Sequence, residues 1–251
     1  MSSLRCVAVV VPARDEEQTL GGCLRSLDLA RRALQRRRPE IAVRVLVVLD
    51  RCVDGSADVV AGHPDVETLV VSAGCVGGAR AAGVDHALGR GHAGTNPRGR
   101  LHGEVVDLGA VWVASTDADS VVPPHWLTAQ VDLAEGGHDL VLGTVEPHDL
   151  DASLLGRWAQ RHHLLDGHPH VHGANLGVRA SRYVEAGGFP GVGLHEDVLL
   201  ADAVKATGAP WVATDSTRVR TAGRLEGRVD GGFATYLREL ATDAQVAPAV
   251  P

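Results

Sequence analysis

Aromatic residues are scarce in this chain. Phe, Trp and Tyr together make up 3% of its 251 residues, whereas hydrophobic residues as a whole make up 45%. A core of ordinary size can therefore form, but Val, Leu and Ala must fill most of it. Lysine is rarer still, since Lys205 is the only one.

Positive charge is also in short supply. The chain carries 24 Lys and Arg against 31 Asp and Glu, a formal net charge of −7. Because an acidic surface repels phosphate backbones, we exclude a general nucleic-acid-binding role. One basic run, Arg31 to Arg38, departs from this balance. It suits the C-terminus of an exposed helix, and contact with an anionic membrane or carrier is the alternative.

Long hydrophobic runs are missing as well. No apolar stretch approaches the ~18 residues that a transmembrane segment needs, and the N-terminal segment reaches charged residues too early for a secretory leader. Neither a CxxC pair nor a zinc-type spacing occurs among the four cysteines, Cys6, Cys23, Cys52 and Cys75. We expect a soluble cytoplasmic protein with free thiols, and peripheral membrane contact as the alternative.

Short β-branched runs alternate with helical patterns. Strands are predicted over 7–11, 43–49, 66–71 and 111–115. Helices are predicted over 16–37, 57–61 and 77–88, a loop over 90–104, a helix that begins near Glu196, and a frayed tail from Ala241. This order favours an α/β fold: a Rossmann-like, mostly parallel central sheet with helices on both faces. Ligands bind such sheets at the carboxyl ends of the strands.

Two carboxylates stand at one predicted strand end. The run VWVAST leads directly into Asp117-Ala118-Asp119. In extended backbone, residues i and i+2 point the same way, so both side chains can converge on one ligand. Close carboxylates repel each other, and a divalent cation relieves that repulsion. Oxygen ligands suit Mg²⁺ or Mn²⁺, which a substrate diphosphate would complete.

A second acidic pair stands at a helix start. Glu196 and Asp197 precede an apolar helical pattern, where acids commonly complement the helix dipole. Alternatively, Asp197 is a general base. His195, beside the pair, is a candidate acceptor or phosphate contact.

The chain resembles family-2 glycosyltransferases of the GT-A fold. The resemblance is carried, in order, by VVVPARDEEQTLGGCLRSL, VVLDRCVDGSAD, GGARAAG, ASTDADS, GANLGVR and HEDVLLA. It covers roughly Val7 to Gly208 and implies transfer of a sugar from a nucleotide-sugar donor to an acceptor hydroxyl, with inversion. The expected donor is a UDP-sugar, and the acceptor a small or carrier-linked molecule.

The resemblance also implies roles for individual residues. The nucleotide would be bound by Pro12, Ala13, Arg14, Glu16, Asp50, Arg80, Asp117 and Ala118. Asp50 would accept the ring N–H of the base, Asp117 would hold the ribose or the metal shell, and Asp119 would ligate the metal. Asn175 and Glu196 would line the sugar and acceptor pocket, and Asp197 would deprotonate the acceptor.

The same resemblance divides the domain into halves. Residues 1–120 would bind the nucleotide sugar, 121–240 the acceptor, and 241–251 would form a flexible tail.

The chain departs from the family pattern in two places. Arg51 stands where many members carry a second acid, so Asp54 need not be an equivalent residue. The Gln-x-x-Arg-Trp motif of processive synthases is absent from the sequence, which favours a single transfer per encounter.

Several alternatives remain open at this stage. A retaining GT-A transferase using a GDP- or UDP-sugar is the nearest, although no His follows His195 to serve as its metal ligand. A nucleotidyltransferase and a non-catalytic nucleotide-sugar binding module are further candidates. The sequence does not determine the oligomeric state.

Three further sets of side chains have two interpretations each. His168, His170 and His172 could bind zinc or form a half-exposed segment beside the acceptor pocket. Arg218, Arg220 and Arg224 could screen the diphosphate or lie on the surface. Trp126 and Trp158 could stack on a sugar, but core packing is the expected role.

Overall fold

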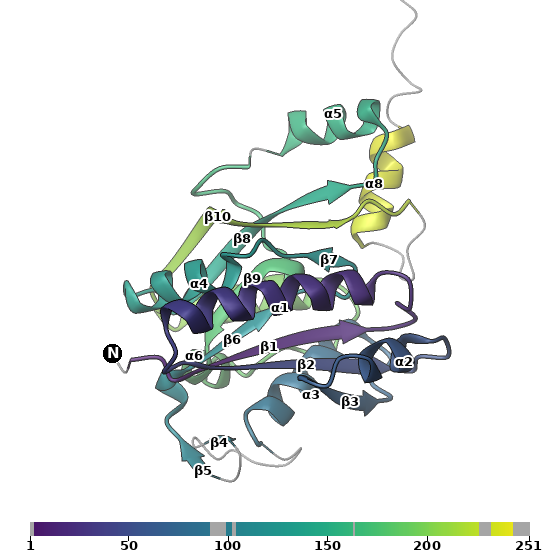
Figure 1. Cartoon of the computed structure of the whole chain (residues 1–251). Coiled ribbons are helices and arrows are strands. Elements are labelled where there is room, and N and C mark those ends of the chain that lie inside the picture. Colours follow the sequence, from purple (N-terminus) through teal and green to yellow (C-terminus); the bar gives the residue numbers. More distant parts are fainter. Residues whose placement is uncertain (1–2, 91–98, 102–103, 163, 226–231, 243–251) are drawn as a thin grey trace, which may run out of the picture.

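One eight-stranded sheet organises the chain (Figure 1). The computed structural model describes residues 3–90, 99–101, 104–162, 164–225 and 232–242. The strand order is β3-β2-β1-β6-β9-β8-β10-β7. The strands are β1 (Cys6–Ala13), β2 (Ala42–Asp50), β3 (Val66–Val71), β6 (Val111–Ser115), β7 (Ser120–Val121), β8 (Leu140–His148), β9 (Leu176–Arg179) and β10 (Trp211–Ala222).

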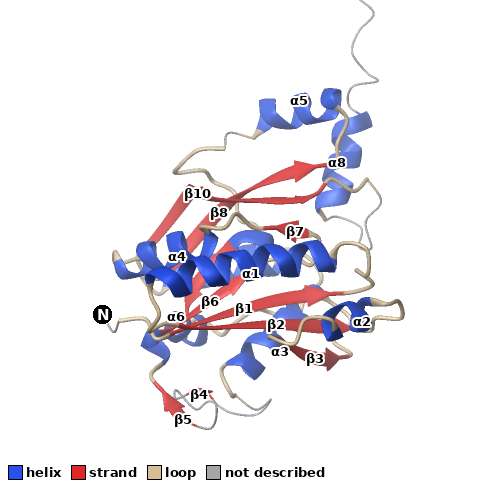
Figure 2. Cartoon of the chain, viewed as in Figure 1, coloured by secondary structure: helices blue, strands red, loops and turns tan. Residues whose placement is uncertain are grey.

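The sheet is mixed but mostly parallel. β3, β2, β1 and β6 run in one direction, and β8 and β10 form a second parallel pair. β9 is antiparallel to both of its neighbours, β6 and β8, so it joins the two parallel groups. The carboxyl ends of β1, β2 and β6 therefore meet at one edge (Figure 2).

Helices cover both faces of this sheet. They are α1 (Leu20–Arg37), α2 (Ser56–Ala61), α3 (Val76–Ala87), α4 (Trp126–Glu135), α5 (Ala152–Arg161), α6 (Ala180–Glu185), α7 (Glu196–Ala206) and α8 (Phe233–Thr242). Strand β1 shows why two layers form: Val7, Val9 and Val11 pack towards α1 and α4, whereas Ala8 and Val10 pack towards α3, α6 and α7. Successive strand side chains alternate between faces, so an unbroken apolar strand must be covered twice.

The predicted fold class is confirmed, and β3 and β6 have the predicted bounds. Three local predictions were wrong. α1 begins at Leu20, because Glu16 to Thr19 form a turn whose hydrogen bonds precede the helix. The predicted loop over 90–104 contains the hairpin strand β4 (Gly99–Leu101) and the start of its partner β5 (Glu104–Val106), although 91–98 and 102–103 lie outside the described residues. Helix α8 includes Ala241 and Thr242, and the rest of the expected tail is not described.

The expected boundary at residue 120 falls within the continuous sheet. β9, from the second half, pairs with β6 of the first. β7 begins at Ser120 and pairs with β10. The two halves therefore share one framework, with α5 and α8 placed beyond the β8–β10 side (Figure 1).

The basic run at the end of α1 is largely neutralised within the protein. Arg31 pairs with Asp28 and Asp65, Arg37 with Asp132, and Arg38 with Glu40 and Glu135. Arg32 also pairs with Asp28. These contacts fit an exposed helix end. None of the helices in the described part of the chain has the length and apolarity that a membrane span requires.

Two helical glycines test the packing of the layers. A Cβ at Gly83 in α3 would lie 2.6 Å from side-chain atoms of both Val10 and Val48, whereas a Cβ at Gly156 in α5 would meet nothing within 4 Å. We expect Gly83→Ala to lower the free energy of unfolding by about 1–3 kcal/mol through overpacking. Gly156→Ala should raise it by roughly 0.5–1 kcal/mol through helix propensity. Denaturant titration measures both, and equal effects would contradict this packing.

Candidate active site

A cavity of about 280 Å³ lies at the carboxyl ends of β1 and β2. Seven of the eight residues expected to bind the nucleotide line it: Pro12, Ala13, Arg14, Glu16, Asp50, Asp117 and Ala118. Asp119 lines it too, as do Gly74, Cys75, Val76, Ala79 and Gly193, which the sequence did not indicate. We call this the donor cavity. Its position is where ligands bind in open α/β sheets.

Reciprocal hydrogen bonds join the loops after β1 and β2. The Glu17 N–H donates to Asp54 Oδ2 at 2.9 Å, and the Gly55 N–H donates to Glu17 Oε2 at 2.8 Å. The Glu16 N–H donates to Ser56 Oγ at 2.8 Å. The segments PARDEE and RCVDGSAD thus hold each other in place, and Glu16 also lines the donor cavity.

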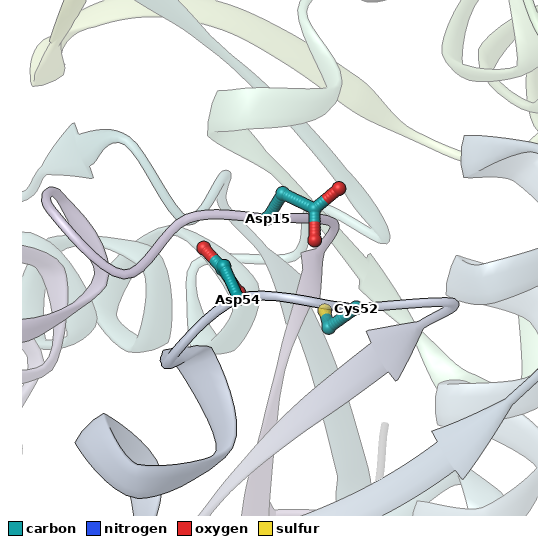
Figure 3. Close-up of side chains that lie close together, drawn as sticks. All are labelled: Asp15, Cys52 and Asp54. Carbon is teal, nitrogen blue, oxygen red and sulfur yellow. The ribbon is translucent and has the colours of Figure 1, made fainter.

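Asp15, Cys52 and Asp54 bring three potential metal-ligand atoms within 4.8 Å of one another in these loops (Figure 3). Their polar atoms also serve the loops themselves. Asp15 Oδ1 accepts the Val53 N–H at 2.7 Å, Asp54 Oδ1 accepts the Ser56 N–H at 3.0 Å, and the Cys52 thiol donates to a backbone carbonyl. Burial raises the pKa of Cys52, which favours the protonated thiol over a metal-binding thiolate.

The base-binding candidate Asp50 ends β2 with a buried carboxylate. Both of its oxygens accept the Gly74 N–H, at 3.0 and 2.9 Å. Arg51, where a second acid was expected, has a positive φ of 56°. Its side chain bends back to the Ser72 carbonyl at 3.2 Å. The guanidinium therefore braces the loop after β3.

Asp117 and Asp119 follow β6 and line the donor cavity, and the end of β10 contacts Asp119 directly. The Thr221 hydroxyl donates to Asp119 Oδ1 at 3.2 Å, and the Ala222 N–H donates to the Asp119 carbonyl at 3.2 Å. Arg224 pairs with Glu16 and lies 3.6 Å from Asp119. Of Arg218, Arg220 and Arg224, it is therefore Arg224 that lies beside the acidic pair, close to Asp119. Arg218 instead pairs with Asp215, and Arg220 is exposed.

The electrostatics of this acidic group favour a cation. Burial, followed by the negative charges of Asp117 and Glu16, raises the pKa of Asp119 to about 6. The charge of Arg224 acts in the opposite direction but does not cancel these effects. Carboxylate oxygens beside a cavity fit the preferences of Mg²⁺ and Mn²⁺.

Arg80 lies behind Asp117, only 3% exposed. Its guanidinium donates to carboxylate oxygens of both Asp117 and Glu196, and its Nε donates to Ser115 Oγ at 3.1 Å. Burial by itself lowers the pKa of Arg80, but the surrounding carboxylates outweigh it and raise the value overall. Arg80 is therefore a permanent cation that joins the end of β6 to the start of α7.

A second cavity, of about 360 Å³, adjoins the first and shares Val76, Asp117 and Gly193 with it. We call it the acceptor cavity. The candidates Arg80, His195, Glu196 and Asp197 line it. Phe233 and Tyr236 of α8 line it too, although the sequence gave no indication of their role.

Backbone donors hold Asp197 at the start of α7. Its Oδ2 accepts the Gly173 N–H at 2.6 Å, and its Oδ1 accepts the Val198 N–H at 2.8 Å. His195, which precedes the acidic pair, has a positive φ of 61°. Backbone of this kind is costly for a residue other than glycine and is found preferentially at functional sites. Burial raises the pKa of Glu196 in spite of its pairing with Arg80.

Asn175 occupies a different place from the other candidates. It is 1% exposed, and its amide donates to the carbonyls of Thr144 and Thr217, both at 2.8 Å. Its Oδ1 accepts the Trp126 indole N–H at 2.8 Å. Asn175 lines neither cavity. These hydrogen bonds tie β8, β10 and α4 together beneath the site, and both Trp126 and Trp158 are buried, as expected.

The three alternating histidines do not form a zinc site. Their rings stack along the chain, with centroids 6.0 Å apart for His168 and His170 and 5.9 Å for His170 and His172. Rings stacked in this way do not direct three nitrogens at one point. Within the described residues, the Asp15 cluster is the only group of three or more such side chains whose ligand atoms all lie within 4.8 Å of one another.

The raised pKa of Asp119 has a consequence for stability. Because its folded value lies above the ordinary 3.8, the carboxyl contributes stability below pH 3.8 that is lost as the pH rises through 6. We expect the stability of Asp119→Asn relative to wild type to rise by up to about 2 kcal/mol between pH 4.5 and 7.5. Denaturant titration at both pH values measures it, with Asp58→Asn on the exposed face of α2 as control. A constant difference would contradict the assigned electrostatics.

Solved structures of other proteins share the fold of this chain. Staphylococcus aureus TarS 1-349 in complex with UDP-GlcNAc aligns at 14% identity, covering 97% of this chain and 68% of that one, with a TM-score of 0.61. Mannosyltransferase PcManGT from Pyrobaculum calidifontis, in complex with GDP-Man and Mn²⁺, aligns at 20% identity over 98% and 65% of the two chains, with a TM-score of 0.55. GalNAc-T7 with UDP, GalNAc and Mn²⁺ aligns at 12% identity over 95% and 48%, with a TM-score of 0.60.

At these identities the solved structures establish the fold, and this chain spans from about half to two thirds of their lengths. Among curated proteins no sequence matches it. The model of the family "Glycosyl transferase family 2" matches residues 8–162, more than half of the chain. The chain is therefore a member of glycosyl transferase family 2, with the fold of the GT-A glycosyltransferases.

Proposed function

We propose that this protein is a metal-dependent, inverting glycosyltransferase that uses a UDP-sugar. The observation that carries the proposal is the junction of the two cavities at Asp117. A nucleotide in the donor cavity and a hydroxyl beside Asp197 in the acceptor cavity would approach each other there. Two structures of the same similar protein, TarS, hold UDP and UDP-GlcNAc, which supports a uridine donor, with Asp50 as the partner of the base N–H.

Asp119 and Asp117 would hold Mg²⁺ or Mn²⁺. Their carboxylate oxygens and the raised pKa of Asp119 fit a site that gains by taking up a cation. When bound, such an ion neutralises the charge that grows on the departing diphosphate. Arg224 contacts Glu16 and lies near Asp119, so it would supply further positive charge beside the diphosphate.

Asp197 would act as the general base. Two backbone N–H groups orient its carboxylate at the start of α7. The acceptor oxygen would bond to the anomeric carbon while the bond from that carbon to the diphosphate oxygen breaks. The acceptor proton would pass to Asp197, and the electron pair would leave with the diphosphate.

The same geometry bears on the alternatives. A nucleotidyltransferase usually carries a glycine-rich basic loop after its first strand, whereas Glu16 and Glu17 here engage the neighbouring loop. A retaining enzyme with a GDP-sugar stays the nearest rival, because one solved relative holds GDP-Man and Mn²⁺. The identity of the nucleotide distinguishes the two donors.

Thermal unfolding tests the donor assignment. UDP with Mn²⁺ should raise the stability by about 2.7 kcal/mol at a hundredfold its dissociation constant. GDP, CDP and ATP should shift it less, and Asp119→Asn should lose the Mn²⁺-dependent part. A shift selective for GDP would replace the uridine donor, and the absence of any shift would contradict the proposal.

Asp197→Asn tests the general base. The amide keeps the shape of the side chain but cannot take up the proton, so turnover should fall by about 10²–10⁴-fold. The stabilisation by UDP and Mn²⁺ should stay at the wild-type value. Unchanged sugar transfer would rule out this role of Asp197.

A further inference from the structure

Two of the chain's few aromatic rings line the same cavity as Asp197. The sequence contains two Phe and two Tyr. Tyr183 and Phe189 are buried against each other in the core, whereas Phe233 and Tyr236 line the acceptor cavity. The rings of the latter pair have centroids 6.5 Å apart and planes inclined by only 24°. Both side chains therefore offer aromatic surface to the cavity.

This surface is held in place by packing outside the sheet. Leu237 and Leu240 of α8 form a small core with Leu154 and Trp158 of α5, and the two helices lie side by side (Figure 1). The His162 ring stacks on Trp158 at 4.6 Å and meets the edge of Tyr236 at 5.3 Å. The contact with His162 thus holds the Tyr236 ring in place in the absence of a ligand.

The charges around the acceptor cavity are predominantly negative. Asp117, Glu196 and Asp197 line it, and its guanidinium, Arg80, is already paired with two of them. Burial lowers the pKa of His172, on the same wall, to about 4, so this ring is neutral at pH 7. Within the described part of the lining, no Lys or second Arg is available to pair with an anionic ligand.

We propose that the acceptor is an uncharged pyranoside whose ring stacks on Phe233 and Tyr236 and directs a hydroxyl at Asp197. This inference rests on the proposed function. The C–H groups of a pyranose give it an apolar face that is buried favourably against aromatic rings, while its hydroxyls remain available at the edge. Among the described lining residues, a carboxylate or phosphate on the same ring would meet three acids and no unpaired Lys or Arg, which leaves its desolvation uncompensated.

Saturation-transfer NMR in the presence of UDP and Mn²⁺ tests the inference. The probes are the methyl β-glycopyranosides of glucose, galactose and mannose, methyl β-glucuronoside as the matched anion, and glycerol as a polyol without a ring. At least one neutral pyranoside should bind, and glucuronoside and glycerol should bind at least about fivefold more weakly. Tyr236→Ala and Phe233→Ala should each weaken the neutral probe by roughly three- to tenfold, and Tyr236→Phe should restore it.

The control is Trp211→Ala, which removes an exposed ring stacked on Lys205 and absent from both cavities. It should leave probe binding unchanged. Thermal stabilisation by UDP is measured in every variant and confirms that each is folded with an intact donor cavity. Tighter binding of glucuronoside or glycerol, binding of no pyranoside, or equal binding by Tyr236→Ala would overturn the inference. If UDP did not stabilise the wild type, the proposed function itself would be overturned.

Discussion

The buried guanidinium of Arg80 is the interaction on which the site depends. It contacts Asp117 after β6, Glu196 at the start of α7, and Ser115 within the sheet. A charge at this depth is tolerated only when it is fully paired, so these partners are fixed together. Because Asp117 borders the donor cavity and Asp197 directly follows Glu196, one side chain sets the distance between the two halves of the site.

Glycines in the backbone around Arg80 leave the space that its side chain and the neighbouring segments occupy. A Cβ at Gly173 would lie 2.5 Å from the Arg80 Cζ, and one at Gly77 would lie 2.1 Å from the Pro190 carbonyl oxygen. Gly77 also donates its N–H to the Val192 carbonyl at 3.1 Å. Glycine at position 77 therefore lets α3 approach the segment before α7 closely, and glycine at position 173 leaves room for the Arg80 guanidinium. Asp15, Arg51 and His195 add positive-φ backbone to the surrounding loops, where such conformations commonly serve function.

The sequence located the residues around the donor cavity more completely than those around the acceptor cavity. The end of a strand can be recognised in the sequence, because an apolar run that stops near Asp50 or Asp117 is visible in the residue pattern alone. The acceptor side depends on contacts between distant segments. The amide of Asn175 could equally have faced a sugar, and only the packing of β8, β10 and α4 around it consumes its hydrogen bonds. Likewise, no periodicity places Tyr236 in the same cavity as Asp197.

The sequence by itself determined the α/β class, the ends of the first strands and the acidic residues that stand there. Those features are local, since alternation, apolar runs and turn residues act within a few positions of the chain. Tertiary structure decided which arginines pair with the acidic residues of the two cavities. Arg80 and Arg224 did so, whereas Arg218 paired with Asp215 and Arg51 turned back to its neighbouring loop. Long flexible side chains can reach several partners, so only the packed arrangement of strands and helices selects among them.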